Sequence, residues 1–343
     1  MLPLSEIARL AATVDAQWHS PVADAASAAW GRAAGTALFW RSSACHVFVV
    51  LDESGTHRQA FLRLMPAHLV RPDQVETIAA LTHRLANQGL AVARALPSSA
   101  GRLVETIETG EWRGYAMMLA NAPGEQLDPE TLSPERAEAW GAALGRLHRD
   151  GDAAASGLAL PDGFEQADRA FAILEGDVCA EAVEIVHSRL RALPRGPDQY
   201  GLIHGDFELD NLAWSSEHPV AFDWDEAERS WFAADIAKAV EELVPEPNAW
   251  VSQPLPLLDA FLDGYERERP SERIDRPRLA LFAAHSALRS LARLRPVLAE
   301  APDTGGDLAS PPDRAGPRPL RSVLDEHAER MRTVASTLAP LAG

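Results

Sequence analysis

Cysteine is scarce in this chain, and long apolar runs are absent. Cys45 and Cys179 are its two cysteines and lie far apart in 343 residues, so we expect neither a disulfide framework nor a zinc site of paired cysteines. No segment approaches the roughly 18 apolar residues that a membrane-spanning helix requires. The N-terminal segment has no basic start and no continuous apolar core, and these absences together predict a soluble cytoplasmic protein with no membrane partner.

Positive charge is also in short supply. The chain has 50 acidic and 32 basic residues and a net charge of −18, which argues against a nucleic-acid partner or an anionic membrane surface, because both attract basic patches. A cationic substrate would suit this charge, but only loosely. Lys238 is the sole lysine, which is typical of a compositional bias. The pattern GxxxxGK[ST] occurs nowhere, so the P-loop class has no support.

The length and the 46% hydrophobic content are sufficient for two lobes. Alternating runs predict strands, and a helix from Pro72 to Gly89 is indicated by its first-turn proline and terminal glycine. Strands are expected at 36–40, 46–51, 59–64, 91–96, 102–107 and 115–119, and further helices at 4–34, 133–149, 167–193, 256–268, 278–298 and 320–338. Loops are expected at the Gly-, Ala- and Asp-rich residues 150–163 and the Pro- and Gly-rich residues 301–319.

One stretch late in the chain carries polar side chains in a spacing that suits phosphoryl transfer. His204 and Asp206 follow an apolar strand-like segment, Asn211 comes five positions after Asp206, and Asp223 ends a second short strand. Transfer from ATP depends on positioning and charge neutralisation more than on covalent help. Asp206 would be the catalytic base, while Asn211 and Asp223 would give oxygen ligands to Mg²⁺. The alternative is a surface turn in which these side chains cap the backbone.

At these positions the chain resembles the aminoglycoside phosphotransferases and choline-kinase-like phosphotransferases. That family carries a His-Gly-Asp-x4-Asn loop, matched by residues 204–211, an Ile-Asp-Phe-Asp-like strand end, matched by 221–225, and an Asp-Leu-Ala-like helix start at Asp235. The resemblance implies an α+β, two-lobed protein-kinase-like fold, with a small antiparallel-sheet N-lobe that has one main helix and a larger, mostly helical C-lobe. It implies the roles given above for the loop residues, and it makes Asp235 a structural brace of the catalytic loop.

The turn at residues 121–124 is expected to separate the lobes. Residues 1–121 would form the nucleotide-binding lobe with a helical preface, and residues 122–343 the catalytic and substrate-binding lobe. In the resembled family this point is the hinge, and backbone groups near Met118 and Ala120 would bind the adenine edge. A Phe-x-Asp-Gly-Tyr run before an Arg-rich helix leans towards the branch that contains homoserine-kinase-like and stress-response kinases.

The third predicted strand carries Arg63 where protein kinases place a lysine that touches the α and β phosphates. Strand alternation turns Leu62 and Leu64 to one side and Arg63 to the other. Glu76 is the carboxylate of the following helix that is placed to orient Arg63, so both are expected at the nucleotide. The alternative is a strand arginine that reaches solvent. Residues 41–45 lie where a phosphate-covering loop belongs, but they include no glycine.

These residues predict an ATP- and Mg²⁺-dependent phosphotransferase acting on a hydroxyl of a small molecule that is aminoglycoside-, amino-alcohol- or sugar-like. The alternatives are a Ser/Thr protein kinase of the stress-response type and a nucleotide-binding pseudokinase, and the intact loop argues against the latter. His148 is expected to be a packed helix-end histidine. Trp224, Trp231 and Phe232 are expected in the core rather than in an acceptor pocket. The sequence identifies neither the acceptor nor the oligomeric state.

Overall fold

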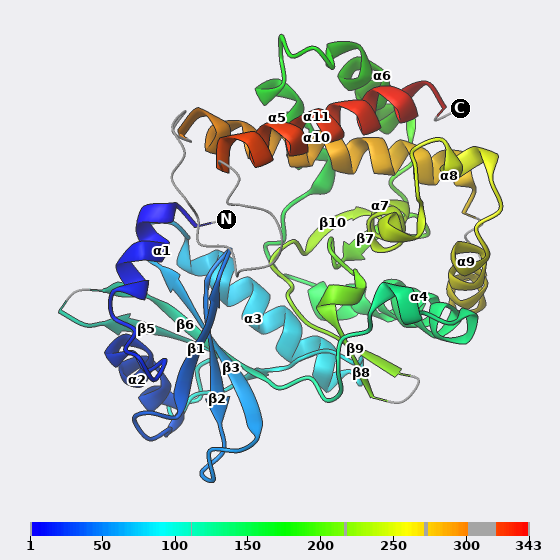
Figure 1. The fold of residues 1–343 in the computed structure, drawn as a ribbon. Helices are drawn as coiled ribbons and strands as arrows, with labels where there is room; N and C mark the ends of the chain where they lie inside the picture. The colour runs from blue at the N-terminus through cyan, green and yellow to red at the C-terminus, as the bar shows by residue number, and fades with distance from the viewer. Residues whose placement is uncertain (1, 111, 216–217, 271–273, 301–319, 342–343) are drawn as a thin grey trace. The chain divides into compact units, whose positions relative to one another are not determined.

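The computed structural model describes residues 2–110, 112–215, 218–270, 274–300 and 320–341, so the loop expected at 301–319 lies outside the described residues. The chain forms two compact units (Figure 1). Unit 1 comprises Met1–Asp128, Arg149–Leu160 and Leu209–Ala227, and unit 2 comprises Pro129–His148, Pro161–Glu208 and Glu228–Gly343. Each unit is therefore discontinuous in sequence, and the lobe boundary expected after residue 121 stays a prediction.

Unit 1 is built on a six-stranded sheet in the order β1-β2-β3-β6-β4, with β5 also paired to β6. All of these pairings are antiparallel. The strands are β1 (Ala37–Ser42), β2 (His46–Leu51), β3 (Arg58–Pro66), β4 (Ala95–Leu96), β5 (Val104–Glu108) and β6 (Arg113–Ala120). Its helices are α1 (Leu4–Ala11), α2 (Pro21–Ser27), η1 (Ala28–Trp30) and α3 (Pro72–Asn87). These elements confirm the predicted antiparallel sheet with one main helix.

The two faces of this sheet bury different side chains. Leu62 and Leu64 of β3 are fully buried and pack with Val22 of α2 on one face. Val75 of α3 packs on the other face, and Arg63 points to that side, where its Nε donates to Cys45 Sγ. The predicted alternation along β3 is therefore confirmed. Each buried leucine contributes about 1.5–3 kcal/mol, which fixes the register that presents Arg63.

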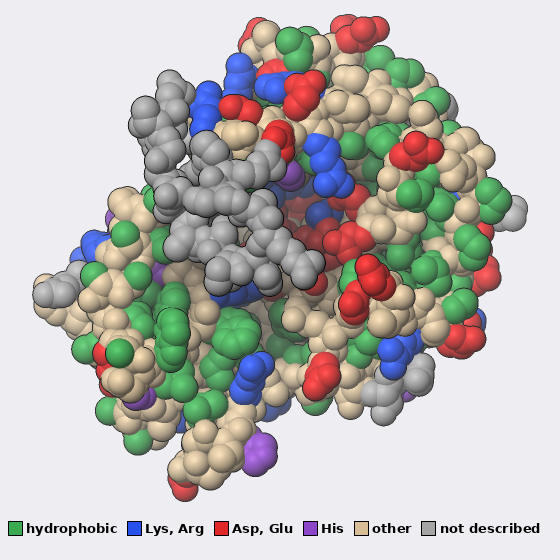
Figure 2. Space-filling view, in the orientation of Figure 1, with side chains coloured by type: hydrophobic (Ala, Val, Ile, Leu, Met, Phe, Trp, Pro, Cys, Tyr) green, Lys and Arg blue, Asp and Glu red, His purple; other side chains and the backbone are tan. Residues whose placement is uncertain are grey.

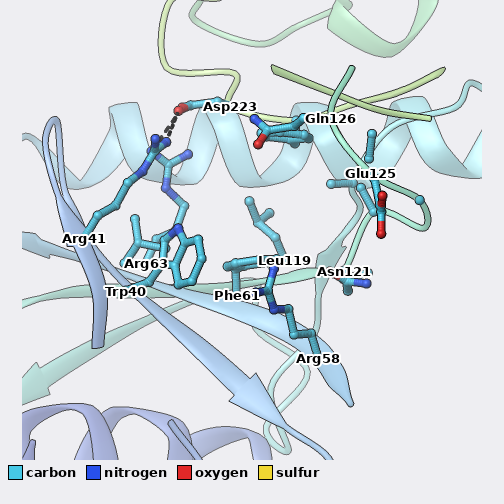
Figure 3. Close-up of a pocket in the computed structure, with 17 residues that line it drawn as sticks. Trp40, Arg41, Arg58, Phe61, Arg63, Leu119, Asn121, Glu125, Gln126 and Asp223 are labelled. Atoms are coloured by element: carbon cyan, nitrogen blue, oxygen red, sulfur yellow. Dashed lines mark hydrogen bonds and ion pairs between the residues drawn. The ribbon is translucent and has the colours of Figure 1, made fainter. Parts of the chain in front are cut away.

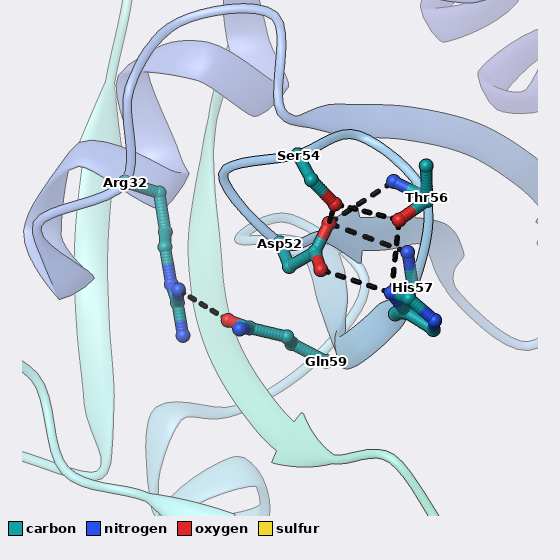
Figure 4. Close-up of polar contacts among 6 residues, drawn as sticks. All are labelled: Arg32, Asp52, Ser54, Thr56, His57 and Gln59. Carbon is teal, nitrogen blue, oxygen red and sulfur yellow. Dashed lines mark hydrogen bonds and ion pairs between the residues drawn. The ribbon is translucent and has the colours of Figure 1, made fainter.

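A side-chain carboxylate organises the turn between β2 and β3 (Figure 4). Asp52 Oδ1 accepts hydrogen bonds from Ser54 Oγ at 2.7 Å, from the Thr56 backbone N–H at 3.0 Å and from the His57 N–H at 3.3 Å. These bonds lower the pKa of Asp52, the Ser54 bond most. Gly55 has a φ of +72°, which only glycine adopts without strain. The turn is thus specified locally and sets how β3 begins.

A two-stranded ribbon completes unit 1. The ribbon consists of β8 (Leu212–Ser215) and β9 (His218–Ala221), and the short 3-10 helix η3 (Leu209–Asn211) leads into it. Backbone hydrogen bonds join it to two other segments of unit 1. The Ala93 N–H donates to the Ala221 carbonyl at 2.8 Å, and the Trp214 N–H donates to the Glu125 carbonyl at 2.8 Å. The ribbon is therefore held on both of its edges.

The helices account for most of unit 2. Its elements are η2 (Pro129–Thr131), α4 (Pro134–Ala155, of which the last residues belong to unit 1), α5 (Gly163–Ile173), α6 (Ala180–Ala192), α7 (Phe232–Ala239), η4 (Glu241–Leu243), α8 (Ala249–Ser252), α9 (Pro256–Glu268), α10 (Arg276–Glu300), α11 (Leu320–Leu338) and η5 (Ala339–Leu341). The strands β7 (Tyr200–Ile203) and β10 (Glu228–Trp231) form an antiparallel pair. The predicted helical C-terminal part is confirmed.

Three helix predictions need correction. The helix expected at 4–34 is divided into α1, α2 and η1, with the non-helical residues 12–20 before Pro21 begins α2. Helix α4 continues to Ala155, although residues 150–163 were expected to form a loop, because the run Asp152-Ala-Ala-Ala has a helix propensity that outweighs the glycine before it. The expected helix at 167–193 is two helices, α5 and α6, with the turn around Gly176 between them, where φ is +77°.

Close packing in unit 2 depends on glycine at one helix crossing. A Cβ placed on Gly264 of α9 would lie 1.9 Å from the Glu138 carbonyl oxygen of α4. Trp140 of α4 packs edge-on against Phe261 of α9, with ring centroids 5.0 Å apart. The small residue lets the two backbones meet, so that the aromatic side chains interlock.

The surface has the charge expected from the composition. Acidic side chains are spread widely over the face seen in Figure 2, as the net charge of −18 requires. None of the helices in the described ranges is long and apolar enough to cross a bilayer.

Candidate active site

A pocket of about 540 Å³ opens on the sheet of unit 1 (Figure 3). Its volume lies within the range of about 300–1,000 Å³ that small-molecule sites occupy. The lining combines apolar side chains with three arginines and two carboxylates, and all of its residues belong to unit 1: Trp40, Arg41, Val47, Arg58, Phe61, Arg63, Ala93, Leu119, Ala120, Asn121, Ala122, Gly124, Glu125, Gln126, Ala213, Phe222 and Asp223. The sheet supplies apolar lining, and Arg41, Arg63 and Asp223 gather at one end of the pocket.

Two arginines converge on Asp223 at that end of the pocket (Figure 3). Arg41 Nη2 of β1 lies 3.3 Å from Asp223 Oδ2, and Arg63 Nη2 of β3 lies 3.3 Å from Asp223 Oδ1. Arg63 also donates to Asp225 Oδ2 at 2.5 Å. The Arg63 side chain is only 6% exposed, so the alternative of a solvated strand arginine is wrong. The predicted position of Arg63 beside the pocket is confirmed, and its role at the nucleotide stays a prediction.

Burial and charge act in opposite directions on this arginine and carboxylate pair. Burial alone would lower the pKa of Arg63, but Asp225, Cys45 and Asp223 hold it well above its usual range. Burial raises the pKa of Asp225, and repulsion by Asp223 adds to this, whereas Arg63 opposes it. Burial also raises the pKa of the Cys45 thiol to about 11, so that Cys45 is a neutral packing partner of Arg63 and not a nucleophile.

The position of Asp223 is set by the β8–β9 ribbon. Leu212 pairs with Ala221, and the Phe222 N–H donates to the Asn211 carbonyl at 3.0 Å, which places Asn211 and Asp223 at the same end of the ribbon. Asp223 has a φ of +65°, a left-handed conformation that is rare outside glycine and gathers at functional sites. The structure therefore places the two predicted metal ligands at one end of a single hairpin.

These residues fit a hard divalent cation in chemical terms. Asn211 offers a carboxamide oxygen, and Asp223 and Asp225 offer carboxylate oxygens, which are the donors that Mg²⁺ prefers. Among the described residues no group of three or more His, Cys, Asp or Glu side chains is arranged as a metal site. A cation here would consequently take the rest of its ligands from phosphate and water, which is the usual arrangement for Mg²⁺ with a nucleotide. Metal binding by Asn211 and Asp223 stays a prediction.

The segment after β6 forms another wall of the pocket. Ala120 lines the pocket and donates its N–H to the Arg94 carbonyl at 2.8 Å. Met118 does not line it: its side chain is fully buried in the core on the opposite face, and it pairs with Leu62 and Leu96 in the sheet. On this wall the lining begins at Leu119, and binding of the adenine edge by backbone groups near Met118 and Ala120 stays a prediction.

Gly124 allows the chain to leave this wall. Its φ is +106°, and a Cβ would lie 2.1 Å from the Trp214 carbonyl oxygen. The following residue, Glu125, donates its N–H to the same Trp214 carbonyl at 3.2 Å, and Gln126 Nε2 donates to the Asp210 carbonyl. A side chain at position 124 would push the ribbon away from the pocket wall, so glycine is required here.

Glu76 does not orient Arg63 in this structure. The residue is exposed on α3, whereas the ion-pair partners of Arg63 are Asp225 and Asp223. The physical reason is the face of α3 on which it lies: the neighbours Val75 and Thr77 are buried, which leaves Glu76 on the solvent side. A part for Glu76 in nucleotide binding stays a prediction.

The loop that follows β7 in unit 2 and carries Asp206 is braced from the start of α7. Asp235 is fully buried and accepts the backbone N–H groups of His204 and Gly205, both at 2.8 Å. His148 Nε2 lies 3.0 Å from Asp235 Oδ2, and His148 Nδ1 lies 2.9 Å from the Tyr265 hydroxyl. Asp235 thus holds the loop backbone, as predicted. His148 is packed, as predicted, but it lies inside α4 and not at its end, because the helix continues to Ala155.

The ionisation of Asp235 follows from these contacts. Burial alone would raise its pKa, but the hydrogen bond and charge of His148, together with His204, hold the pKa of Asp235 below its usual range. A buried carboxylate that accepts several N–H groups stays ionised. Asp235 is thus a fixed negative charge beneath the loop that carries Asp206.

Asp206 itself lies beside a cation. Its side chain is 32% exposed, and its Oδ1 lies 3.8 Å from Lys238 Nζ. The same ammonium contacts Glu208 Oε1 and lies 3.5 Å from Glu241 Oε2. Burial raises the pKa of Glu208, while Lys238 opposes this. The Asp206 carboxylate is therefore accessible to a substrate and lies in a cluster of charged side chains around Lys238. Its role in catalysis stays a prediction.

Sequence reasoning missed three of these residues. In the sequence, Asp225 is only the last residue of the matched strand end, Arg41 is only one of residues 41–45, and Lys238 is only a sign of compositional bias. A signal existed for each: Asp225 has the two-residue spacing from Asp223 that puts both near one point, Arg41 begins the loop between the first two strands, and Lys238 follows Asp235 by almost one helical turn. Trp224, Trp231 and Phe232 are buried, as predicted.

Comparison with solved structures supports the fold. The amicoumacin kinase hAmiN, in complex with AMP-PNP, Ca²⁺ and Ami, superposes with a TM-score of 0.66 at 18% identity, covering 98% of this chain and 93% of that chain. The microcompartment-associated aminopropanol kinase gives 0.63 at 18% identity, covering 94% and 95%. The spectinomycin phosphotransferase APH(9)-Ia, in complex with ADP and spectinomycin, gives 0.56 at 13% identity, covering 90% and 94%. These likenesses confirm the predicted α+β kinase-like fold.

Comparison of sequences assigns the family. The amicoumacin kinase of Bacillus subtilis (strain 168) is 26% identical over 170 residues, which are 45% of this chain and 48% of that protein, so the match spans about half of that relative. The leaning towards homoserine-kinase-like and stress-response kinases stays a prediction. A model of the phosphotransferase enzyme family matches residues 41–282, which is well over half of the chain. With the loop, the ribbon and the pocket in place, this chain belongs to the phosphotransferase enzyme family.

Proposed function

We propose that this protein is an ATP-dependent kinase that transfers the γ-phosphoryl group to a hydroxyl of a small molecule. The observation that carries the proposal is the convergence of Arg41 and Arg63 on Asp223 at one end of a pocket that apolar side chains such as Phe61 also line. Guanidinium groups bind phosphate oxygens in a bidentate manner, and a carboxylate beside them can hold the metal that accompanies the phosphates. The pocket thus suits a nucleotide with its phosphates at the charged end.

The base of the nucleotide would occupy the apolar part of the pocket. Phe61 and Leu119 line the pocket with apolar side chains, and Ala120 and Ala122 line it as well, so that their backbone groups would be available to the base. Because the Ala120 N–H already donates to Arg94, the adenine edge would use the Ala120 carbonyl and the Ala122 N–H. Family members were solved with AMP-PNP and with ADP, which supports a nucleotide donor for this chain.

Asp206 would accept the proton of the acceptor hydroxyl. The new bond joins the acceptor oxygen to the γ-phosphorus, and the bond from that phosphorus to the β–γ bridging oxygen breaks, with its electron pair leaving on ADP. Mg²⁺ bound through Asn211 and Asp223 would neutralise charge on the phosphates. Asp235 keeps the loop backbone of His204 and Gly205 fixed. This supports the proposal that Asp206 is already positioned as the base before the substrate binds.

The acceptor class is proposed from the relatives and from the charge. Similar proteins are an amicoumacin kinase, an aminopropanol kinase and a spectinomycin phosphotransferase. The net charge of −18 favours the approach of a cation. We therefore propose a hydroxyl acceptor of the aminoglycoside-, amino-alcohol- or sugar-like class.

The test is ADP formation by the purified full-length protein with ATP and Mg²⁺ and a panel of acceptors. The panel holds spectinomycin, 1-amino-2-propanol, choline, homoserine and casein, and mass spectrometry identifies the phosphorylated product. Phosphorylation of a small acceptor supports the proposal. Phosphorylation of casein alone would replace it with a protein kinase, and ATP binding without turnover of any acceptor or of water would replace it with a pseudokinase.

A further inference from the structure

The chain has one lysine, and the fold places it at the proposed catalytic base. Lys238 is the sole lysine among 343 residues. It lies on α7, and its ammonium contacts Glu208 Oε1, with Glu241 Oε2 at 3.5 Å and Asp206 Oδ1 at 3.8 Å. The Lys238 side chain is 28% exposed. One cation is thus shared by three carboxylates, one of which is the candidate base.

The contacts of α7 with the catalytic loop follow a helical pattern. Asp235 and Lys238 are separated by three positions, so they lie on the same face of α7. Asp235 accepts the backbone N–H groups of His204 and Gly205, while Lys238 reaches the side chains of Asp206 and Glu208. One face of α7 therefore holds both the backbone of the loop, through Asp235, and the side chains of the loop, through Lys238.

The arrangement is more than an exposed surface ion pair. Such pairs contribute little because solvent screens them and a long side chain loses rotamer freedom. Here the surrounding carboxylates raise the pKa of Lys238 although burial opposes this, so the ammonium stays charged. Without it, three carboxylates would face one another, and like charges in proximity repel.

We propose that Lys238 is a positioning residue for phosphoryl transfer, which fixes the Asp206 carboxylate in the orientation that accepts the acceptor's proton. The inference rests on the proposed function, with Asp206 as the base. Lys238 exchanges no proton itself. The proton passes from the acceptor hydroxyl to Asp206 as the new oxygen–phosphorus bond forms and ADP leaves, and Lys238 holds Asp206 and Glu208 while this occurs.

The first test separates kcat from KM in two variants. Lys238→Met removes the charge and keeps most of the side-chain length, and we expect kcat to fall by roughly tenfold to a hundredfold, since small misplacements of a catalytic group have effects of this size. The KM for ATP should change by less than about twofold, because a residue that positions the base affects the rate of the chemical step and not the binding of ATP. Lys238→Arg keeps the charge and should recover part of kcat. Arg191→Met, at an exposed position on α6, is the matched loss of one positive charge and should leave kcat unchanged.

A double-variant cycle tests whether Lys238 acts through Asp206. In an Asp206→Asn background the base is already lost, so adding Lys238→Met should reduce kcat no further. Coupling of this kind is expected for residues in one network, whereas independent effects multiply. A full additional tenfold loss in the double variant would show that Lys238 acts elsewhere, and it would overturn the proposal.

Chemical modification gives a test on the folded parent protein. Because Lys238 is the sole lysine, amine reagents modify only Lys238 and the N-terminal amine. Acetylation removes the charge and should inactivate the parent protein, while reductive methylation keeps the charge and should retain most of the activity. The Lys238→Arg variant, in which only the N-terminal amine can react, should keep its activity after both treatments. Mass spectrometry measures the extent of modification at Lys238.

Two results would overturn the inference while the proposed function stands. These are parent-like kcat in Lys238→Met, or undiminished activity of the parent protein after complete acetylation of Lys238. The readout is ADP release with a reactive acceptor of the panel, or with water as the acceptor if none reacts. Should the parent protein release no ADP under any of these conditions, it is the proposed function that fails, and the inference about Lys238 fails with it.

Discussion

Arg63 donates to Asp225, with Nη2 and Oδ2 2.5 Å apart, and the same nitrogen lies 3.3 Å from Asp223. Arg63 belongs to β3, and the two aspartates follow β9, so this contact joins the sheet to the end of the ribbon within unit 1. A nucleotide phosphate in the pocket would compete with these carboxylates for the guanidinium, and a metal would compete with the guanidinium for Asp223. In the absence of a ligand, the positive charges of Arg41 and Arg63 are therefore balanced by Asp223 and Asp225.

Substitution of Arg63 tests this relationship. Arg63→Ala is expected to raise the KM for ATP by tenfold or more, because a buried guanidinium that would bind phosphate is lost, and Arg63→Lys should be partly defective, because lysine cannot make a bidentate contact. Stability should fall as well: removal of one partner of a buried ion pair costs about 3–5 kcal/mol, and less is expected here since the Asp225 side chain is 30% exposed. Steady-state kinetics and thermal unfolding measure the two effects.

Glu76→Ala is the matched control for the orientation of Arg63. Because Glu76 is exposed and Arg63 pairs with Asp225, the structure predicts a KM for ATP close to the parent value, whereas Asp225→Ala should raise it. A Glu76→Ala defect as large as that of Arg63→Ala would return Glu76 to the nucleotide site. Parent values for Arg63→Ala itself would assign the phosphate contact to another residue, with Arg41 the first to test.

Asp206→Asn should remove turnover and keep the fold. A positioned general base contributes on the order of 10²- to 10⁴-fold in rate, and the amide is nearly the same size as the carboxylate, so kcat should fall by this amount while ATP affinity is kept. Asp206 is 32% exposed, and hence the melting temperature should change little. Turnover within a few-fold of the parent value would show that another group takes the proton.

Asp223→Asn should weaken ATP binding in a metal-dependent way. The substitution replaces an anionic oxygen ligand with a neutral one, and it also leaves Arg41 and Arg63 with one carboxylate fewer. ATP titration with Mg²⁺ should show a loss of affinity that is smaller or absent in EDTA. If the loss of ATP affinity is equal with Mg²⁺ and with EDTA, Asp223 acts by orienting Arg41 and Arg63 and does not bind a metal.

Much of the fold could be predicted because its signals are local. The side chains of the strand that carries Arg63 alternate between the two faces of the sheet as predicted. Pro72 and Gly89 mark the ends of their helix because proline suits the first turn and glycine adopts the positive φ that follows the last turn. The end of α4 was missed because the loop signal of Gly151 is weak against three alanines in sequence. Local propensity at this point is compatible with either a helix or a loop, and tertiary packing determines which of the two forms.

Partners within the site were harder to predict than its members. Asp223 and Asn211 could be found because their spacing is fixed within one hairpin. The partner of Arg63 could not be predicted, because Glu76 and Asp225 are both carboxylates that follow Arg63 in sequence. The choice between them depends on which face of α3 is buried. The proposed part of Lys238 could not be predicted for a similar reason: its distance to Asp206 depends on how α7 packs against the loop that follows β7.

Asp235→Asn should reduce stability in a way that depends on pH. The folded pKa of Asp235 lies below its ordinary value of 3.8, so its ionised form contributes stability that is fully present above that value and is lost as pH falls through the folded pKa. At neutral pH the variant should be less stable by roughly 3 kcal/mol, because the buried N–H groups of His204 and Gly205 and the His148 ring lose a charged partner. The difference from the parent should shrink in acid, which urea unfolding at about pH 7 and about pH 3 would measure. A difference that stays constant across this range would mean that the charge of Asp235 is not what holds the catalytic loop, and that its shape alone suffices.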